Sequence, residues 1–145
     1  MELRYMLDAN IVIYIRRKRP ESVLRRFGRL RQGEACISVI AFGELLYGAN
    51  KSSQRESALE QLYELARELP AHPMPENAAA TYGFIRAELE SRGEMIGNND
   101  LWIAAHALAA GLTLVTNNEK EFRRVRGLKV QDWTTQQLRR QKSRQ

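Results

Sequence analysis

The sequence predicts a single α/β domain in which a short, mostly parallel sheet carries helices on both faces. The chain has 145 residues, a length typical of one domain with its own core. Short apolar segments alternate with longer segments of helical periodicity, and this alternation is typical of parallel sheets covered on both sides. No internal repeat or low-complexity linker divides the chain. We expect one domain over residues 1–133, followed by a basic tail at 134–145.

Four short apolar segments are the predicted strands. They lie at residues 3–7, 35–40, 112–116 and 129–131. The segment 112–116 is the clearest buried strand of the chain. Pro70, Pro73 and Pro75 mark a short extended segment between two helices.

The predicted helices carry apolar residues on one face and end at glycine or proline. They lie at residues 10–16, 21–31, 53–69, 76–92 and 98–110, and a further helix contains Glu44 and ends before Gly48. Gly93 stands where a left-handed residue ends a helix, and Gly111 ends the following one.

The net charge of +6 is unevenly distributed along the chain. Basic residues outnumber acidic ones at both ends, whereas the middle is acidic, and this suggests a polyanionic partner. The alternative is that the arginine-rich faces are only solvated. The apolar runs are too short to span a bilayer, so we expect a cytoplasmic protein. Cys36 is the only cysteine and is expected to be a small buried apolar residue.

Carboxylates stand at the ends of predicted elements. Only three of the seventeen acidic residues are aspartates; Asp8 follows the first strand, and Asp100 begins a helix. Glu44 lies on a helix that must pack on the core. Strands of a parallel sheet end at the same edge, where ligands bind, so Asp8 and the Asn117-Asn118 turn are expected together. Such oxygen ligands suit Mg²⁺.

Each acid also has a purely structural interpretation. Asp8 could cap the helix that follows it. Asp100 could be stabilised by the helix dipole, and Glu44 could face water. Periodicity alone does not show that the three converge.

Four ordered sequence blocks closely resemble the PIN-domain toxins of VapC type. The blocks are Met-Leu-Asp-Ala-Asn-Ile (6–11), Ser-Val-Ile-Ala-Phe-Gly-Glu-Leu-Leu-Tyr-Gly-Ala (38–49), Ile-Gly-Asn-Asn-Asp-Leu-Trp-Ile-Ala-Ala-His (96–106) and Leu-Val-Thr-Asn-Asn-Glu-Lys-Glu-Phe (114–122). The resemblance extends from about Met1 to Trp133. It implies a PIN-like fold and a Mg²⁺- or Mn²⁺-dependent endoribonuclease, neutralised by a cognate VapB-type antitoxin.

By this similarity, Asp8, Glu44 and Asp100 match the family's acidic metal site. Many PIN domains have a further Asp after the last core strand, whereas this chain has Asn118, which is expected to hydrogen-bond a ligand or water. Glu121 lies three residues further on and could compensate. We therefore expect one well-bound ion, with a second that needs substrate phosphate.

Two basic segments are expected to hold the RNA backbone. They comprise Arg16, Arg17, Lys18, Arg19, Arg123, Arg124 and Arg126. The resemblance suggests structured RNA such as tRNA as the substrate class, and it implies a homodimer.

The histidines are not expected to take part in the chemistry. His72 lies in the proline-rich connector and is expected at the surface. His106 lies on a different helix face from Asp100 and is expected to pack. Trp102 could stack on a base, although core packing is the favoured interpretation.

Two other functions remain as alternatives. A noncatalytic RNA-binding domain would explain the charge but not Asp8 and Asp100. A phosphatase of the haloacid dehalogenase type also has an Asp after its first strand, but it needs a second Asp two residues on, where this chain has Asn10.

Overall fold

The centre of the molecule is a parallel β-sheet. The structure is a computed structural model and describes residues 2–135. Within this range the sheet has five strands in the order β3-β2-β1-β4-β5, and every neighbouring pair is parallel. The strands are β1 (Tyr5–Leu7), β2 (Ala35–Ser38), β3 (Ala71–His72), β4 (Thr113–Val115) and β5 (Val130–Gln131). The predicted α/β class and the parallel sheet are confirmed.

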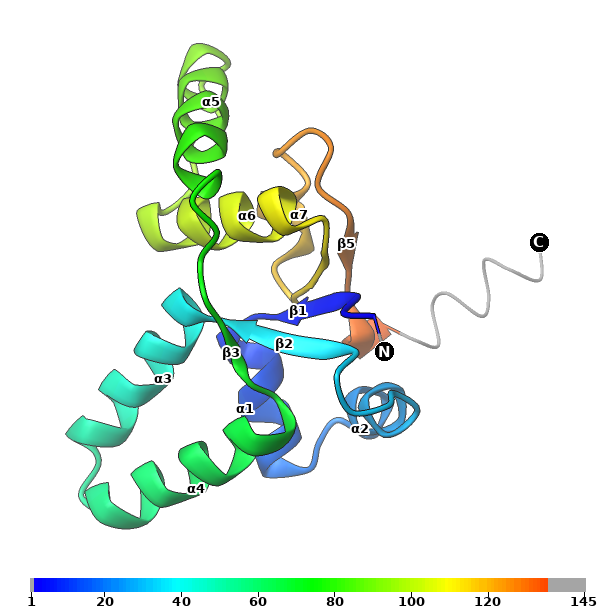
Figure 1. The fold of residues 1–145 in the computed structure, drawn as a ribbon, viewed down its shortest axis with the longest axis vertical. Coiled ribbons are helices and arrows are strands. Elements are labelled where there is room, and N and C mark those ends of the chain that lie inside the picture. Colours follow the sequence, from blue (N-terminus) through cyan, green and yellow to red (C-terminus); the bar gives the residue numbers. More distant parts are fainter. Residues whose placement is uncertain (1, 136–145) are drawn as a thin grey trace.

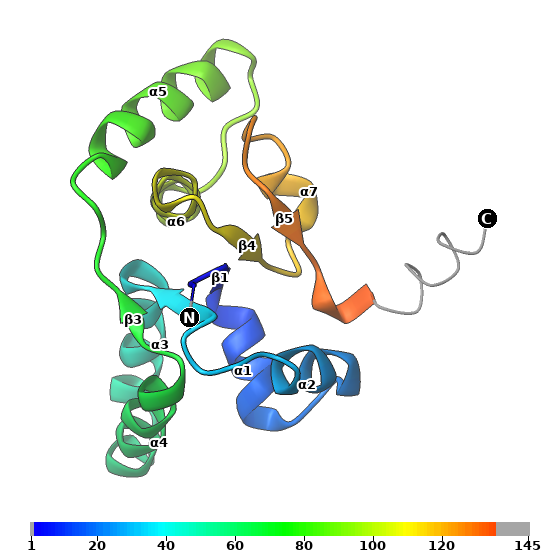
Figure 2. The same cartoon turned by 45° about the vertical axis from the view of Figure 1, so that its right-hand side comes forward.

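Helices cover both faces of the sheet (Figure 1). One face carries α1 (Ala9–Arg17), α2 (Glu21–Gly28), α3 (Val39–Lys51) and α4 (Arg55–Glu68). The other carries α5 (Ala78–Ser91), α6 (Asn98–Ala110) and the short α7 (Glu119–Phe122). Figure 2 shows α5 lying outside α6, which is closer to the sheet. A 3-10 turn, η1 (Trp133–Thr135), packs against α2. Most of the predicted basic tail, residues 136–145, lies outside the described residues.

The register of the sheet brings three strand ends together. Leu7 of β1 pairs with Ile37 of β2 and with Val115 of β4. β1 and β2 are fully buried, as expected for strands covered on both faces. The residues that follow β1 and β4 at this edge are Asp8 and Thr116, and the backbone amide of Asp8 donates to the carbonyl of Val115 at 3.0 Å.

Several elements differ from the predictions. The prediction that the helix of Glu44 ends before Gly48 is wrong, because α3 continues to Lys51, and α7 forms where only a turn was predicted. β2 ends at Ser38 rather than at residue 40, because the Ser38 side chain caps α3 by accepting from the amide of Ile40 at 3.1 Å. α2 ends at Gly28, three residues early. The connector predicted as merely extended forms the edge strand β3, paired in parallel with β2. Flanking prolines are compatible with an edge strand, where backbone donors can remain unpaired.

A left-handed glycine positions α6 against β4. Gly111 has φ of 71° and follows the last helical residue, as predicted. The amide of Leu112 then donates to the carbonyl of Ala107 at 2.9 Å, so the chain turns directly into β4. The opposite end of α6 carries Asp100. Within residues 2–135, the helices are too short or too polar to cross a membrane.

Candidate active site

Asp8 is buried at the carboxyl edge of the sheet, with 8% of its surface exposed. Its Oδ1 accepts a hydrogen bond from the backbone amide of Ile11 at 3.1 Å, so Asp8 caps α1. Its Oδ2 accepts a hydrogen bond from the hydroxyl of Thr116, at the end of β4. That hydroxyl accepts from the amide of Asn118 at 3.0 Å. The carboxylate is therefore held by the first turn of α1 and by the end of β4.

Burial raises the pKa of Asp8 to about 6. The hydrogen bonds from Thr116 and Ile11 lower the pKa and only partly offset the burial. The negative charge of Asp100 raises it further. Capping of α1 by Asp8 does not explain why a second carboxylate, Asp100, lies near it.

Asp100 lies in the first turn of α6 and is half-buried. Burial raises its pKa, and the charges of Glu121 and Glu44 raise it further. Asp100 therefore interacts electrostatically with acids from three other parts of the fold: the end of β1, helix α3 and helix α7. The folding topology brings together four acids that are widely separated in the sequence.

Glu44 is exposed on α3, at the outer side of this cluster. Its Oε2 accepts a long hydrogen bond of 3.4 Å from Nδ2 of Asn99, the residue before Asp100. It also lines two surface hollows, one of about 490 Å³ between α1, α3 and α4, and one of about 560 Å³ beside Tyr47 and Asn99. Glu44 is thus the member of the cluster most accessible from outside.

Asn118 and Glu121 complete the edge on the side of α7. Nδ2 of Asn118 donates to Oε2 of Glu121 at 3.1 Å, and both residues are half-buried. Asn118 stands at the position where many similar sequences were expected to have an Asp, and its side-chain NH₂ group binds the carboxylate of Glu121. Glu121, in turn, lies close enough to affect the pKa of Asp100.

The donor set fits a hard divalent cation by its chemistry. The available donors are oxygen atoms. Burial raises the pKa of Asp8 and of Asp100, and the charges of neighbouring acids raise both further, so a cation would relieve a repulsion among these carboxylates. Within the described residues, however, no three side chains of His, Cys, Asp or Glu are arranged to hold one metal ion. The predicted site therefore rests on the pair Asp8 and Asp100, with Glu44 further out.

Thr116 is the site residue that the sequence analysis missed. It is fully buried, and its hydroxyl joins Asp8 to the backbone of Asn118. The only signal in the sequence is its place at the end of a buried strand, where a hydroxyl needs a partner.

The first basic segment lies at the far end of α1. The side chains of Arg17, Lys18 and Arg19 are exposed. Arg16 is half-buried, and its guanidinium donates to Gln61 at 3.0 Å. Arg16 and Arg17 line the 490 Å³ hollow together with Glu44, the outermost acid of the cluster.

The second basic segment is engaged within the protein. Arg123 pairs with Glu119 at 2.7 Å. Arg124 donates to the carbonyl of Met95 at 3.0 Å, and Arg126 approaches Glu88 at 4.0 Å. These contacts make the second segment a weaker candidate for RNA binding than the first.

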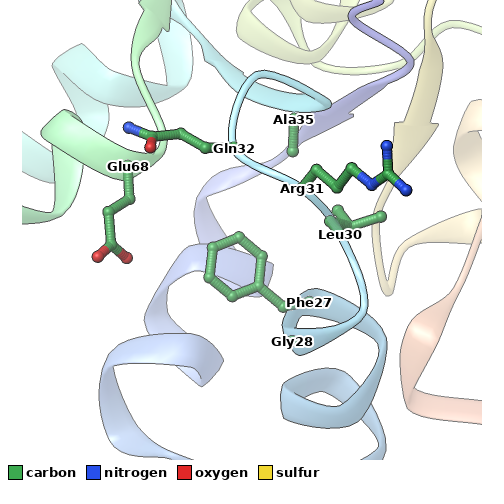
Figure 3. Close-up of a pocket in the computed structure, with 7 residues that line it drawn as sticks. All are labelled: Phe27, Gly28, Leu30, Arg31, Gln32, Ala35 and Glu68. Atoms are coloured by element: carbon green, nitrogen blue, oxygen red, sulfur yellow. The ribbon is translucent and has the colours of Figure 1, made fainter. Parts of the chain in front are cut away.

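A further pocket, of about 280 Å³, lies at the opposite edge of the sheet, where β2 begins (Figure 3). Its apolar lining includes Phe27, Leu30 and Ala35. In Figure 3 the guanidinium of Arg31 points away from the Phe27 ring, and Glu68 lies on the other side of the pocket. The charged groups do not converge, so this pocket is not a candidate catalytic site.

The two histidines form a pair, and the prediction that His72 lies at the surface is wrong. His72 is half-buried in β3, and its Nδ1 lies 2.8 Å from Nε2 of His106. His106 is fully buried, with Nδ1 3.3 Å from the hydroxyl of Ser38. Through these two contacts His106 joins α6 to β3 and β2. A buried imidazole needs polar partners, and His72 and Ser38 supply them. The half-buried Trp102 stacks on Tyr82, with ring centroids 3.8 Å apart.

Comparisons with known proteins agree with this arrangement. A model of the PIN domain matches residues 5–128. The chain is 44% identical to Ribonuclease VapC2 of Haemophilus influenzae over 90% of this chain and 98% of the relative. It is 42% identical to the tRNA(fMet)-specific endonuclease VapC of Shigella flexneri, over 91% and 99% of the two chains.

Solved structures show the same fold. A chain of VapBC-1 from nontypeable Haemophilus influenzae superposes with a TM-score of 0.84 at 38% identity, over 92% of this chain and 99% of that chain. A chain of VapBC2 from Rickettsia felis, bound to a DNA fragment from the promoter, gives 0.83 at 40% identity, with the same coverage. The chain therefore belongs to the PIN-domain family and, within it, to the VapC ribonucleases of toxin–antitoxin systems.

Proposed function

We propose that this protein is a Mg²⁺-dependent endoribonuclease toxin that hydrolyses phosphodiester bonds in structured RNA, with tRNA as the substrate class. The observation that carries the proposal is the position of the buried Asp8 at the carboxyl edge of a parallel sheet, bonded to the end of β4 and close enough to Asp100 for that charge to raise its pKa. Ligands bind at this edge in such sheets. A buried carboxylate beside further acids is suited to bind a cation, because the cation relieves their repulsion.

Each residue of the site has a proposed role. Asp8 and Asp100 hold the Mg²⁺ ion, for which Mn²⁺ can substitute, and Glu44 adds a ligand through water or orients the attacking water. Asn118 hydrogen-bonds a ligand or water through the oxygen of its amide, because its Nδ2 is already used by Glu121. The metal supplies a Lewis acid that activates water and neutralises charge on the phosphate.

The RNA backbone lies across the basic end of α1 in this proposal. The exposed cations Arg17, Lys18 and Arg19 neutralise phosphates beside the acidic cluster, with Arg16 at its margin. Arg123, Arg124 and Arg126 contribute mainly to the long-range positive potential, because internal contacts already engage them. A relative from Shigella flexneri bears the name tRNA(fMet)-specific endonuclease, and this supports tRNA as the first substrate to test.

A VapB-type antitoxin is the proposed partner, since similar chains were solved as VapBC assemblies. The 490 Å³ hollow between α1, α3 and α4 suits a partner segment with a basic residue, because it combines apolar Ile13 and Leu45 with the accessible carboxylate of Glu44. We propose that the free toxin acts in the cytoplasm as a homodimer, as the family resemblance implies.

The test is cleavage of purified tRNA(fMet) transcript by the wild-type protein with Mg²⁺ and with EDTA. We expect specific fragments in the presence of Mg²⁺ and none in the presence of EDTA. The variant Asp100→Asn should not cleave the transcript. The matched control variant, Glu56→Gln, removes an exposed acid of α4 and should cleave the transcript as the wild type does. Binding of the transcript without fragments would support the noncatalytic alternative and contradict the proposal. Release of phosphate from small monoesters would support the phosphatase alternative.

A further inference from the structure

A chain of hydrogen bonds runs along the same sheet edge, outside the acidic cluster. Nδ2 of Asn10 donates to Oδ1 of Asn117 at 3.4 Å, and Nδ2 of Asn117 donates to the hydroxyl oxygen of Tyr14 at 3.0 Å. Both bonds run in the same direction, so the chain ends at the hydroxyl of Tyr14. Within residues 2–135 this hydroxyl donates its own proton to no protein acceptor. A hydroxyl both accepts and donates, so one donor remains available.

The helix geometry brings the hydroxyl of Tyr14 back to the turn that follows β4, although Tyr14 lies six residues after Asp8. Long side chains on a helix lean towards its N-terminus, and α1 begins at the sheet edge. The Tyr14 ring packs partly buried against the core. Its hydroxyl reaches Asn117, the residue between Thr116 and Asn118 of the site. The ring is thus held by the core, and its hydroxyl by Asn117.

Tyr14 lies on the same face of α1 as the start of the basic segment. Asn10, Tyr14 and Arg17 are spaced by four and three residues, so they lie on one face of α1. Arg17 is exposed, and Lys18 and Arg19 continue from it. A nucleic-acid strand on this face would meet a neutral donor at the turn that carries Asn117 and Asn118, and cations further along the helix. Tyrosine hydroxyls are established phosphate contacts in nucleic-acid complexes.

We propose that the Tyr14 hydroxyl donates a hydrogen bond to a non-bridging phosphate oxygen of the RNA, next to the bond that is cut. Asn117 and Asn10 are positioning residues that orient the hydroxyl by occupying its acceptor side. A neutral donor suits this position, because a cation would compete with the metal for Asp8 and Asp100. The inference rests on the proposed ribonuclease function and adds a substrate-binding residue to it.

The experiment measures binding and cleavage of labelled tRNA(fMet) transcript by Tyr14→Phe, which keeps the ring. We expect kcat/KM to fall about tenfold or more, as for one lost hydrogen bond to a charged oxygen. In the cleavage-deficient Asp100→Asn background, the same change should weaken binding by a similar factor. The salt dependence of binding should not change, because a neutral hydroxyl releases no counterion, whereas Arg17→Gln should reduce its slope by about one unit.

Two controls separate this role from packing. Tyr63→Phe removes the hydroxyl of an exposed tyrosine on α4 and should cleave and bind as the wild type does. Asn117→Ala should cause a smaller loss, and no loss in a chain that already carries Tyr14→Phe, because the two residues act as one unit. A melting temperature of Tyr14→Phe close to the wild-type value verifies folding.

The outcomes are distinguishable. Wild-type binding and cleavage by Tyr14→Phe would overturn the role of Tyr14 and leave the ribonuclease proposal intact. Additive losses from Tyr14→Phe and Asn117→Ala would overturn the positioning role of the amide. A wild-type protein that neither binds nor cleaves the transcript would overturn both proposals.

Discussion

The hydroxyl of Thr116 donates a hydrogen bond to Oδ2 of Asp8 and thereby joins the end of β4 to the end of β1. The same hydroxyl accepts from the amide of Asn118. One buried threonine thus fixes both the central carboxylate and the turn that carries Asn118. Its position between two strands explains how a carboxylate with a raised pKa is held in a single orientation.

Thr116→Val tests this arrangement, since valine has nearly the same shape and lacks the hydroxyl. The hydrogen bond from Thr116 lowers the pKa of Asp8, so its loss should raise that pKa above about 6. Divalent-ion affinity near neutral pH should fall by about tenfold or more, as for other residues that orient a metal ligand. Calorimetric titration with Mn²⁺ measures this change. An affinity equal to the wild-type value would show that Thr116 does not orient the ligand.

The pH dependence of stability should reveal two buried groups with opposite effects. The pKa of Asp8 is raised from 3.8 to about 6, so the folded state binds this proton more tightly than the unfolded state. Its contribution to the free energy of unfolding therefore falls as pH rises from about 4 to about 6. Burial lowers the pKa of His106 from 6.5 to about 4, and its contribution rises over the overlapping range from about 4 to 6.5.

Single substitutions should separate these two effects in metal-free protein. In Asp8→Asn, the free energy of unfolding should rise more steeply with pH between about 4 and 6.5 than in the wild type. In His106→Gln, the free energy of unfolding should rise less steeply with pH over this range than in the wild type, or should fall. Asparagine can still cap α1 through its oxygen, so Asp8→Asn should fold. Urea denaturation in EDTA, with Glu56→Gln as the surface control, measures the slopes. Slopes in Asp8→Asn equal to those of the wild type would contradict a perturbed Asp8.

Asn118→Asp should convert the neutral position of the site to a charged one. A further carboxylate near Asp100 and Glu121 should tighten Mn²⁺ binding by about tenfold or make a second ion detectable without RNA. The metal-free variant should be less stable, because the bond from Asn118 Nδ2 to Glu121 would become a repulsion. Asn77→Asp adds the same charge at the N-cap of α5, away from the site; it should leave Mn²⁺ binding unchanged and should not destabilise the protein, because an acid is favourable at that position. Two tight ions in the wild-type protein would contradict the role assigned to Asn118.

The sequence predicted the elements with strong periodicity and long apolar runs. β1, β4 and α6 lie close to their predicted positions, because burial on both faces leaves continuous apolar strands. β3 was not predicted as a strand, since two residues between prolines carry no pattern of their own. It forms because the partly unpaired edge of β2 accepts it. α7 was predicted only as a turn, and four residues are too few to show helical periodicity.

The site was predictable only in part for a similar reason. Asp8 and Asp100 stand at element ends and were recognised from that position and from the family resemblance. Their proximity, however, depends on strand order, which a single sequence does not show. Thr116 and the pairing of His72 with His106 were missed because each involves residues more than thirty positions apart. Local patterns carry no information about such contacts.

The most direct measurement is calorimetric titration of the RNA-free protein with Mn²⁺, comparing wild type with Asp8→Asn and Asp100→Asn. One ion should bind the wild-type protein, and each substitution alone should reduce its affinity by about a hundredfold or more, because each removes one charged ligand. Glu56→Gln should bind as the wild type does. Unchanged binding in both active-site variants would show that Asp8 and Asp100 do not hold a shared cation.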